Sequence, residues 1–460
     1  MKQLEQGFLG KDNIWKLVLR LAIPSMLAQF VNVLYTIVDR IYISNMPEIG
    51  ATALAAVGVC GPIVTLVSSF ANLVGLGGAP LMAIRMGEGN KDAASRILSN
   101  GFLLLSGLSI LLTIVVIAAK GPILRAFGAS GNLYPLANEY LTYYCAGSLF
   151  AILAVGLNCY IIAQGFAKIG MLTVVCGALV NIILDPIFIF AFHMGVKGAA
   201  IATVISQFAS ASIALGFLLS KKSFVPLRIR RPEGKTMLRI LTLGFSPFII
   251  IATDSAMILA LNSMLQKYGG AQGDMLIAAA TIMLSFMQVI TMPLGGITGG
   301  TQPILSYNYG ACLTARVKKS ENCILITCLV FTTVMFLIAQ LAGQLFARIF
   351  TSDPELIAMS VRFIRIYTMM IIPLSFQYAY VDGLTALGIA PIAISLSLGR
   401  KIVVMLTLTL VLPAVWGAEA VFYAEPIADL VAAICSATVY WCVINRILRR
   451  REASAPLRQA

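Results

Sequence analysis

Only 11% of the 460 residues are charged, whereas 59% are hydrophobic and the mean hydropathy is +0.91. Soluble domains carry charge on roughly a quarter of their residues, so this composition excludes a soluble protein and predicts an all-α polytopic membrane protein. The net charge of +14 does not indicate nucleic-acid binding, because the basic residues gather in alternate loops, as orientation in a membrane requires.

The nine cysteines and the single histidine exclude further classes of site. No two cysteines have the CxxC spacing, and most stand within apolar stretches, so neither a disulfide framework nor a zinc site is predicted. No nucleophile stands beside a base or a set of metal ligands. The sequence therefore predicts no enzyme and no cofactor.

Twelve apolar segments are long enough to cross a membrane, since about 20 residues span the hydrocarbon core. A basic linker, residues 221–238, separates two predicted six-helix lobes, residues 1–220 and 239–446, and a polar tail, residues 447–460, follows. The segments lie near 14–44, 54–82, 97–119, 134–163, 170–192, 197–219, 239–266, 275–303, 320–346, 358–387, 392–413 and 417–446.

Lysines and arginines concentrate in the N-terminal segment, in the loops after even-numbered spans and in the tail. Cytoplasmic loops carry an excess of these residues, so both termini are predicted to be cytoplasmic. The opposite loops hold only Lys120, Arg125, Lys197, Lys267 and Arg348.

Four short patterns recur in the same order in the two halves, which indicates a duplication. With six spans each, both halves share one orientation, and a pseudo-two-fold axis along the membrane normal relates them. This arrangement predicts a central cleft between two bundles. The patterns are Leu21-Ala-Ile-Pro24 with Leu243-Gly-Phe-Ser-Pro247, Gly77-Gly-Ala-Pro80 with Gly299-Gly-Thr-Gln-Pro303, Gly165-Phe-Ala-Lys-Ile-Gly170 with Gly383-Leu-Thr-Ala-Leu-Gly388, and Val196-Lys-Gly198 with Val415-Trp-Gly417.

The fifth span contains a carboxylate in an otherwise apolar run, Asn181-Ile-Ile-Leu-Asp185-Pro186. A charged side chain at the bilayer centre costs about 2.5–3.5 kcal/mol on insertion scales, so it persists where it faces a cavity, a partner or an ion. Asn181 and Asp185 share one helical face, and Pro186 frees a backbone carbonyl one turn earlier. The sequence leaves open a structural alternative, a packing asparagine beside a protonated carboxyl.

A second intramembrane acid, Asp39, ends a polar stripe on the first span that also contains Asn32, Tyr35 and Thr36. If the first and fifth spans meet, Asp39 joins the pair on the fifth span. Two carboxylates in a dry site cannot both stay ionised unless a cation enters, so such a cluster would hold a proton or Na⁺.

The second half lacks this pair. Aligned through the recurring prolines, Asp39 corresponds to Asn262, and Asp185 corresponds to the apolar stretch around Val404. We therefore interpret the N-terminal lobe as the ion-coupled one. Asp254 and Asp382 of the second half are either substrate-pocket residues or structural partners of Arg400 and Lys401, and the sequence does not separate these alternatives.

Substrate contacts are predicted from methionines and polar residues inside the spans. Flexible thioethers suit a pocket that repacks around varied ligands, although methionines in a membrane segment are also ordinary packing residues. The buried acids favour a small organic cation or amphiphile as substrate. The candidate contacts are Asn32, Tyr35, Asp254, Met257, Met287, Gln288, Gln377 and Asp382, and Pro24 is a candidate hinge because proline permits a helix to kink.

Along nearly its whole length the chain resembles the multidrug and toxic compound extrusion (MATE) family, in its prokaryotic DinF-like and MepA-like branch. The first span from Pro24 to Asp39, the Gly87-Glu-Gly-Asn-Lys-Asp92 loop, the Asn181–Pro186 motif and Gly198-Ala-Ala-Ile-Ala-Thr203 carry this resemblance. It implies a monomeric antiporter of a prokaryotic inner membrane that exports cationic or amphiphilic compounds in exchange for H⁺ or Na⁺ by alternating access. It also implies that Asp39, Asn181, Asp185 and Thr203 form the cation site.

The resemblance does not extend to an ion site in the second lobe. The NorM-like branch has one acid in the seventh span, where this chain has Asp254, and another in the tenth, where it has Gln377. Two other functions remain as alternatives. A lipid-intermediate flippase would need more spans or a cationic cleft, and a channel or receptor would need polar residues continuous along one pore.

Overall fold

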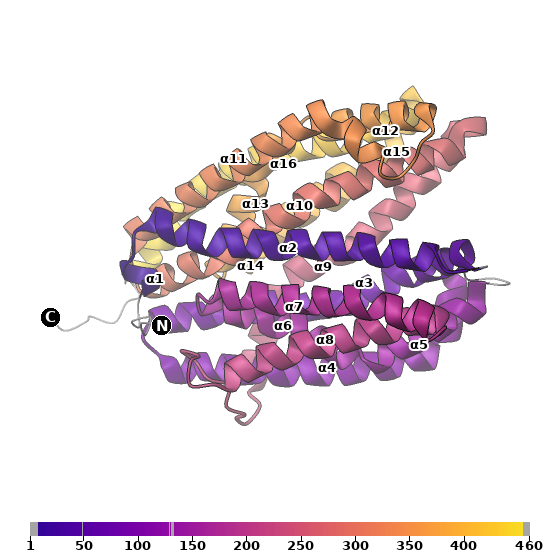
Figure 1. Cartoon of the computed structure of the whole chain (residues 1–460). Helices are drawn as coiled ribbons and strands as arrows, with labels where there is room; N and C mark the ends of the chain where they lie inside the picture. Colours follow the sequence, from indigo (N-terminus) through magenta and orange to yellow (C-terminus); the bar gives the residue numbers. More distant parts are fainter. Residues whose placement is uncertain (1–7, 48, 128, 130–132, 454–460) are drawn as a thin grey trace. The chain divides into compact units, whose positions relative to one another are not determined.

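The structure, a computed structural model, describes residues 8–47, 49–127, 129 and 133–453. Across this part of the chain it contains helices and no strand (Figure 1). The helices form two compact units. Unit 1 comprises Leu27–Ile251, and unit 2 comprises the described residues up to Met26 together with those from Ala252 onward.

Unit 1 is a bundle in which α3 packs against α4, α5 and α6, and α8 packs against α5, α6 and α7. The second part of α2 and the first part of α9 belong to the same unit. The bounds are α2 (Ile14–Ser44), α3 (Gly50–Gly87), α4 (Lys91–Ala126), α5 (Leu133–Ala146), α6 (Ser148–Ala163), α7 (Ala167–Pro186), η1 (Ile187–Ala191), α8 (Gly195–Leu219) and α9 (Gly234–Gly269).

Unit 2 repeats this order of elements. Its α10 packs against α11, α12 and α13, and α13 packs against α16. The bounds are α1 (Phe8–Lys11), η2 (Gly270–Gln272), α10 (Gly273–Gly310), α11 (Thr314–Ala347), α12 (Pro354–Tyr367), α13 (Ile371–Ala386), α14 (Ala390–Leu398), η3 (Gly399–Leu406), α15 (Thr407–Trp416), η4 (Ala418–Tyr423) and α16 (Ala424–Ala453).

Helices occupy all twelve segments predicted to cross the membrane. Among the described residues, nine helical stretches are individually long and apolar enough to cross, and two bent helix pairs add a span each. The seventh predicted span lies within α9. The final helix, α16, continues to Ala453 through part of the predicted tail, whose residues 454–460 lie outside the described ones.

Two features of the halves match each other and were not predicted. The fourth predicted span is α5 and α6 meeting at 54°, and its counterpart is α12 and α13 meeting at 50°. The fifth and eleventh spans each contain a π-helical segment, η1 and η3. Such segments are rare and occur often at functional sites, and here they adjoin Asp185 in one half and contain Arg400 in the other.

Glycines permit the closest helix contacts in unit 1. Gly78 of α3 and Gly101 of α4 both face the ring and hydroxyl of Tyr160, whose hydroxyl donates to the Val74 carbonyl oxygen at 3.1 Å. A Cβ at either glycine would overlap that hydroxyl. These glycines therefore allow α3, α4 and α6 to meet around one buried tyrosine.

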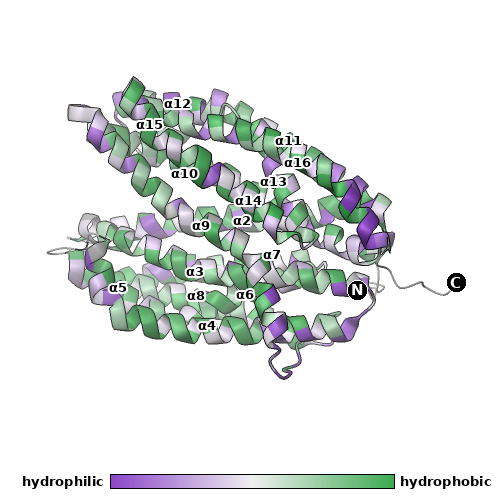
Figure 2. Ribbon diagram, turned by 180° about the vertical axis from the view of Figure 1, so that it is seen from behind, coloured by the Kyte–Doolittle hydropathy of each residue, from purple (hydrophilic) through white to green (hydrophobic). Residues whose placement is uncertain are grey.

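Apolar side chains cover the outer faces of the helices, as a membrane requires. On α4, Ile110, Leu111 and Ile114 are more than half exposed. Figure 2 shows hydrophobic residues along the helices and hydrophilic ones mainly near helix ends and in connecting loops. The exposed rows are surfaces that lipid can cover.

The basic linker is docked onto the first turns of α4. The backbone N–H of Arg230 donates to Ser99 Oγ at 2.8 Å, and that of Glu233 donates to Asn100 Oδ1 at 2.8 Å. Hydrogen bonds from Thr236 and then from Arg96 lower the pKa of the Glu233 carboxyl. The linker is thus an ordered part of unit 1.

Candidate functional site

Helix α7 brings Asn181 and Asp185 into the interior of unit 1. Its other residues are largely apolar, and both polar side chains are fully buried. Pro186 ends the α-helical hydrogen-bonding pattern and the π-helical turn η1 follows. The carboxyl of Asp185 therefore lies where the helix geometry changes.

The Asn181 side-chain amide links α7 to α8. Its Nδ2 donates to Asp185 Oδ1 at 3.2 Å and approaches Thr203 Oγ1 at 3.5 Å. The Thr203 hydroxyl itself donates to the Ala199 carbonyl oxygen at 2.9 Å. Since that hydroxyl proton is used within the helix, the oxygen of Thr203 faces Asn181 as an acceptor.

Helix α2 adds the second carboxyl. Asp39 lies within hydrogen-bonding reach of Asp185, although the two residues are far apart in sequence. The structure thus brings Asp39, Asn181, Asp185 and Thr203 together in one cluster from α2, α7 and α8.

Three oxygens of this cluster have no hydrogen-bond partner among the described residues. They are Asp39 Oδ1, Asn181 Oδ1 and Asp185 Oδ2, and all three are buried. Unsatisfied buried acceptors cost free energy, whereas hard cations bind carboxylate, amide and hydroxyl oxygens. The cluster therefore fits a proton shared between the carboxyls or a bound Na⁺.

Tyr35 of α2 and Tyr140 of α5 lie near the two carboxyls. Tyr35 interacts electrostatically with both Asp39 and Asp185, and Tyr140 interacts with Asp39. The hydroxyl of Tyr144 lies near the side chains of Ser68 on α3 and Gln207 on α8. The sequence analysis proposed Tyr35 as a substrate contact and missed the two tyrosines of α5, although polar aromatics in an apolar span were a usable signal.

The remaining predicted site residues lie on α2 or in unit 2. Asn32 is half-buried, and its carbonyl oxygen accepts from Thr36 at 2.9 Å. Pro24 is buried within α2. In unit 2, Met257 and Met287 are buried in separate hydrophobic clusters, whereas Gln288 is exposed. The side chain of Gln377 is hydrogen-bonded to Ser436, and that of Asp382 interacts with Thr298.

The basic residues of η3 pair with acids in unit 2. Lys401 contacts Asp254, whereas Arg400 contacts Glu425 and Asp429 of α16 and not Asp382. The sequence analysis named neither Glu425 nor Asp429. Their spacing of four residues inside a predicted span was the signal that would have found them.

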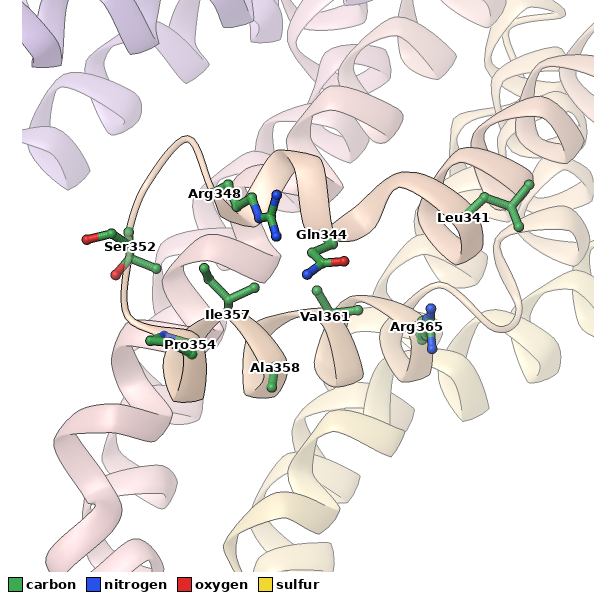
Figure 3. A pocket seen from close by; sticks show the side chains of 10 residues that line it. Leu341, Gln344, Arg348, Ser352, Pro354, Ile357, Ala358, Val361 and Arg365 are labelled. Carbon is green, nitrogen blue, oxygen red and sulfur yellow. The ribbon is translucent and has the colours of Figure 1, made fainter.

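A pocket of about 640 Å³ lies elsewhere in unit 2, between the end of α11 and the start of α12 (Figure 3). Arg348 and Arg365 line it together with apolar side chains such as Leu341 and Val361. None of the predicted site residues contributes to its wall.

A sequence model of the MatE family matches residues 24–187 and, a second time, residues 248–411. The chain belongs to the MATE family. The two matches have equal lengths and fall one in each half, in agreement with the predicted duplication. This MATE protein is accordingly an integral membrane protein whose helices form two bundles.

Known MATE proteins match the chain over almost its whole length. "Multidrug export protein MepA" from Staphylococcus haemolyticus is 23% identical over 451 residues, which cover 97% of this chain and 98% of the relative. A solved outward-facing multidrug resistance MATE transporter has a TM-score of 0.90 at 23% identity and covers 98% of this chain and all of its own. A MATE structure in a bent conformation has a TM-score of 0.89, with 23% identity and the same coverage.

Proposed function

We propose that this MATE protein is a secondary active antiporter that exports cationic or amphiphilic organic compounds in exchange for H⁺ or Na⁺ by alternating access. The relatives named as multidrug export proteins support the export of drugs. The observation that carries the coupling is the group of three buried, unpartnered oxygens on Asp39, Asn181 and Asp185.

The cluster can couple an ion gradient to movement because it joins three helices. With the carboxyls of Asp39 and Asp185 ionised, mutual repulsion opposes the packing of α2 against α7. A proton or Na⁺ supplies the positive charge that removes this repulsion. Coupling then requires that the site binds the ion more tightly in one helix arrangement than in the other, since equal affinity shifts no equilibrium.

The direction of transport follows from the proposed orientation. The basic residues of the N-terminal segment, the linker and the tail support cytoplasmic termini in a prokaryotic cytoplasmic membrane. The inward ion gradient would then drive export. The proposal includes no cofactor besides the coupling ion.

Polar side chains in both units are proposed substrate contacts. Tyr35 and Asn32 stand on α2, the helix of Asp39. In unit 2, Asp254 has a side chain that is 45% exposed even though it is paired with Lys401. An exposed acid can attract an organic cation, which matches the proposed substrate class.

Purified full-length protein in liposomes tests this proposal. An imposed pH gradient and, separately, an imposed Na⁺ gradient should drive accumulation of a fluorescent organic cation, and the ion that drives it is the coupling ion. Accumulation of the organic cation when neither gradient is imposed would contradict antiport. Equilibration of the cation without accumulation would indicate a channel, and transbilayer movement of labelled lipid without cation transport would indicate a flippase.

A further inference from the structure

A second buried group of charges lies in unit 2, at the π-helical segment η3. Arg400 is the second residue of η3, and Glu425 and Asp429 are one turn apart on α16. Their side chains are 8%, 6% and 0% exposed. All three charged groups are therefore removed from solvent and depend on one another.

The hydrogen bonds of this cluster are unequal. Arg400 Nη2 donates to Glu425 Oε1 at 2.6 Å and to Asp429 Oδ1 at 2.6 Å, and Arg400 Nε donates to the same Asp429 Oδ1 at 3.0 Å. Asp429 Oδ2 is buried and has no partner among the described residues. One carboxyl oxygen thus points into the protein interior without a donor.

The surrounding charges do not balance. One guanidinium faces two carboxylates, and the neighbouring cation, Lys401, is already paired with Asp254. Three acids therefore meet two cations, and one negative charge stays uncompensated. The titratable groups that face Asp429 and its partners are Arg400, Lys401, Asp254, Glu425, Tyr367, whose hydroxyl lies 3.5 Å from Glu425 Oε2, and Tyr378 beside Arg400.

We propose that the Arg400–Glu425–Asp429 cluster is a second cation site, which binds one monovalent cation, H⁺ or Na⁺, at the carboxyl of Asp429. Occupation of the site cancels the excess negative charge and gives the unpartnered oxygen a proton or an ion. The sequence analysis assigned ion binding to the first half alone, because the second half has Asn262 and Val404 at the positions that correspond to Asp39 and Asp185. The second half supplies different acids, from α16.

The site is tested by binding measurements that need neither a substrate nor a gradient. Purified full-length protein carrying Asp39→Asn and Asp185→Asn lacks the first cluster's carboxylates and serves as the background. Infrared spectroscopy at mildly acidic pH without Na⁺ detects the carbonyl stretch of a buried protonated carboxyl. Equilibrium binding of radioactive Na⁺ at alkaline pH detects the alternative cation.

Adding Asp429→Asn to the background should remove either one protonated-carboxyl band or one bound Na⁺ per molecule. Glu425→Gln should have the same effect, because a single carboxylate opposite Arg400 is already compensated. Asp353→Asn is the matched control, since Asp353 is an exposed helix N-cap and asparagine caps equally well.

The proposal would be overturned if Asp429→Asn and Glu425→Gln changed neither the infrared band nor Na⁺ binding. The cluster would then be a static group of ion pairs. Elution as a single symmetric peak in gel filtration verifies that each variant is folded, and either variant suffices for the test. Failure of drug export in liposomes would contradict the proposed function and would not affect these binding results.

Discussion

The Asn181 side-chain amide donates to Oδ1 of Asp185 across 3.2 Å, one turn away on α7. This bond fixes one oxygen of the carboxyl and leaves Oδ2 without a partner among the described residues. The Asn181 oxygen is also unpartnered, because only its amide nitrogen is used. The pair thus leaves two buried acceptor oxygens without a donor among the described residues.

Removing either carboxylate charge of this cluster should abolish gradient-driven export. Asp39→Asn and Asp185→Asn keep the shape of the side chain but remove one of the two charges that the coupling ion neutralises, so transport should fall to the level of empty liposomes. Accumulation of a fluorescent organic cation measures this. Asp353→Asn serves as the control, and wild-type transport by either variant would exclude the cluster as the coupling site.

The stability of unit 1 should depend on the close packing of α3 against α9 at two glycines. A Cβ on Gly244 would overlap the backbone carbonyl of Leu73, and one on Gly77 would overlap that of Ile240. Backbone atoms cannot yield as a flexible side chain does, so Gly244→Ala should destabilise the protein by about 1–3 kcal/mol.

The control for this prediction is Gly216→Ala on α8, where no atom lies within 4 Å of the new Cβ. In a helix interior, alanine is favoured over glycine by up to about 1 kcal/mol, so this variant should be neutral or more stable. Thermal unfolding in detergent compares the two variants. Equal melting temperatures would show that α3 and α9 can separate at no cost.

Hydropathy predicted the fold well because each membrane span must be a continuous apolar helix. The first span was predicted at 14–44, and α2 is Ile14–Ser44. The breaks at α5–α6 and α12–α13 were not predicted. Gly147 stands at the first break, and Pro373 lies in the first turn of α13, just after the second. Both residues disfavour a continuous helix, which is a local signal that hydropathy does not contain.

The sequence identified the acids of the first cluster because a carboxylate inside an apolar run stands out. The tyrosines of α5 were a weaker signal, because only the packing of the helices shows which polar aromatic residue of that span lies near Asp39. The cluster at Arg400 was partly hidden for a different reason. Its acids, Glu425 and Asp429, stand one turn apart inside the predicted span 417–446, but only the fold shows that both are buried against Arg400.

Acid should loosen the linker from α4. Hydrogen bonds from Thr236 and Arg96 lower the pKa of Glu233, so the ionised carboxylate favours the docked linker at neutral pH. This contribution is lost as the pH falls through the lowered, folded-state pKa. Hydrogen exchange at the Glu233 amide, corrected for its intrinsic pH dependence, should therefore become faster in acid.

Asn100→Ala is the companion variant for the linker. It removes the acceptor of the Glu233 N–H, so exchange at this amide should already be fast at neutral pH. A variant distant from the linker, Gly216→Ala, should retain the wild-type protection. Unchanged protection in acid would show that the backbone bonds to Ser99 and Asn100 hold the linker without the ion pair.

Replacing Pro24 should impair the bending of α2 during transport more than it impairs ion binding. It is fifteen residues before Asp39 on α2, and the boundary between the compact units follows Met26. The segment around Pro24 packs in unit 2, where a Cβ on Gly300 would overlap the Ser25 side chain. Asp39 belongs to unit 1. Pro24 thus stands where α2 passes from one unit to the other.

A proline inside a helix removes one backbone hydrogen bond and allows a kink at low cost. Pro24→Ala restores that bond and removes a helix penalty of about 3 kcal/mol, so α2 should resist bending. Ion binding should persist because the side chains of the cluster at Asp39 and Asp185 are unchanged, and its affinity should change less than the rate of export. Export should become several-fold slower, since the kinked arrangement is less populated.

Ion-binding affinity and gradient-driven export, measured on the same preparation, separate the possible roles of Pro24. Pro62→Ala in α3 is the matched control, because Pro62 is also inside a helix but not in the helix of Asp39. Unchanged export in Pro24→Ala would show that α2 need not kink during transport. Equal loss of ion binding and export would show instead that Pro24 serves to pack α2, and that the two units move as rigid bodies.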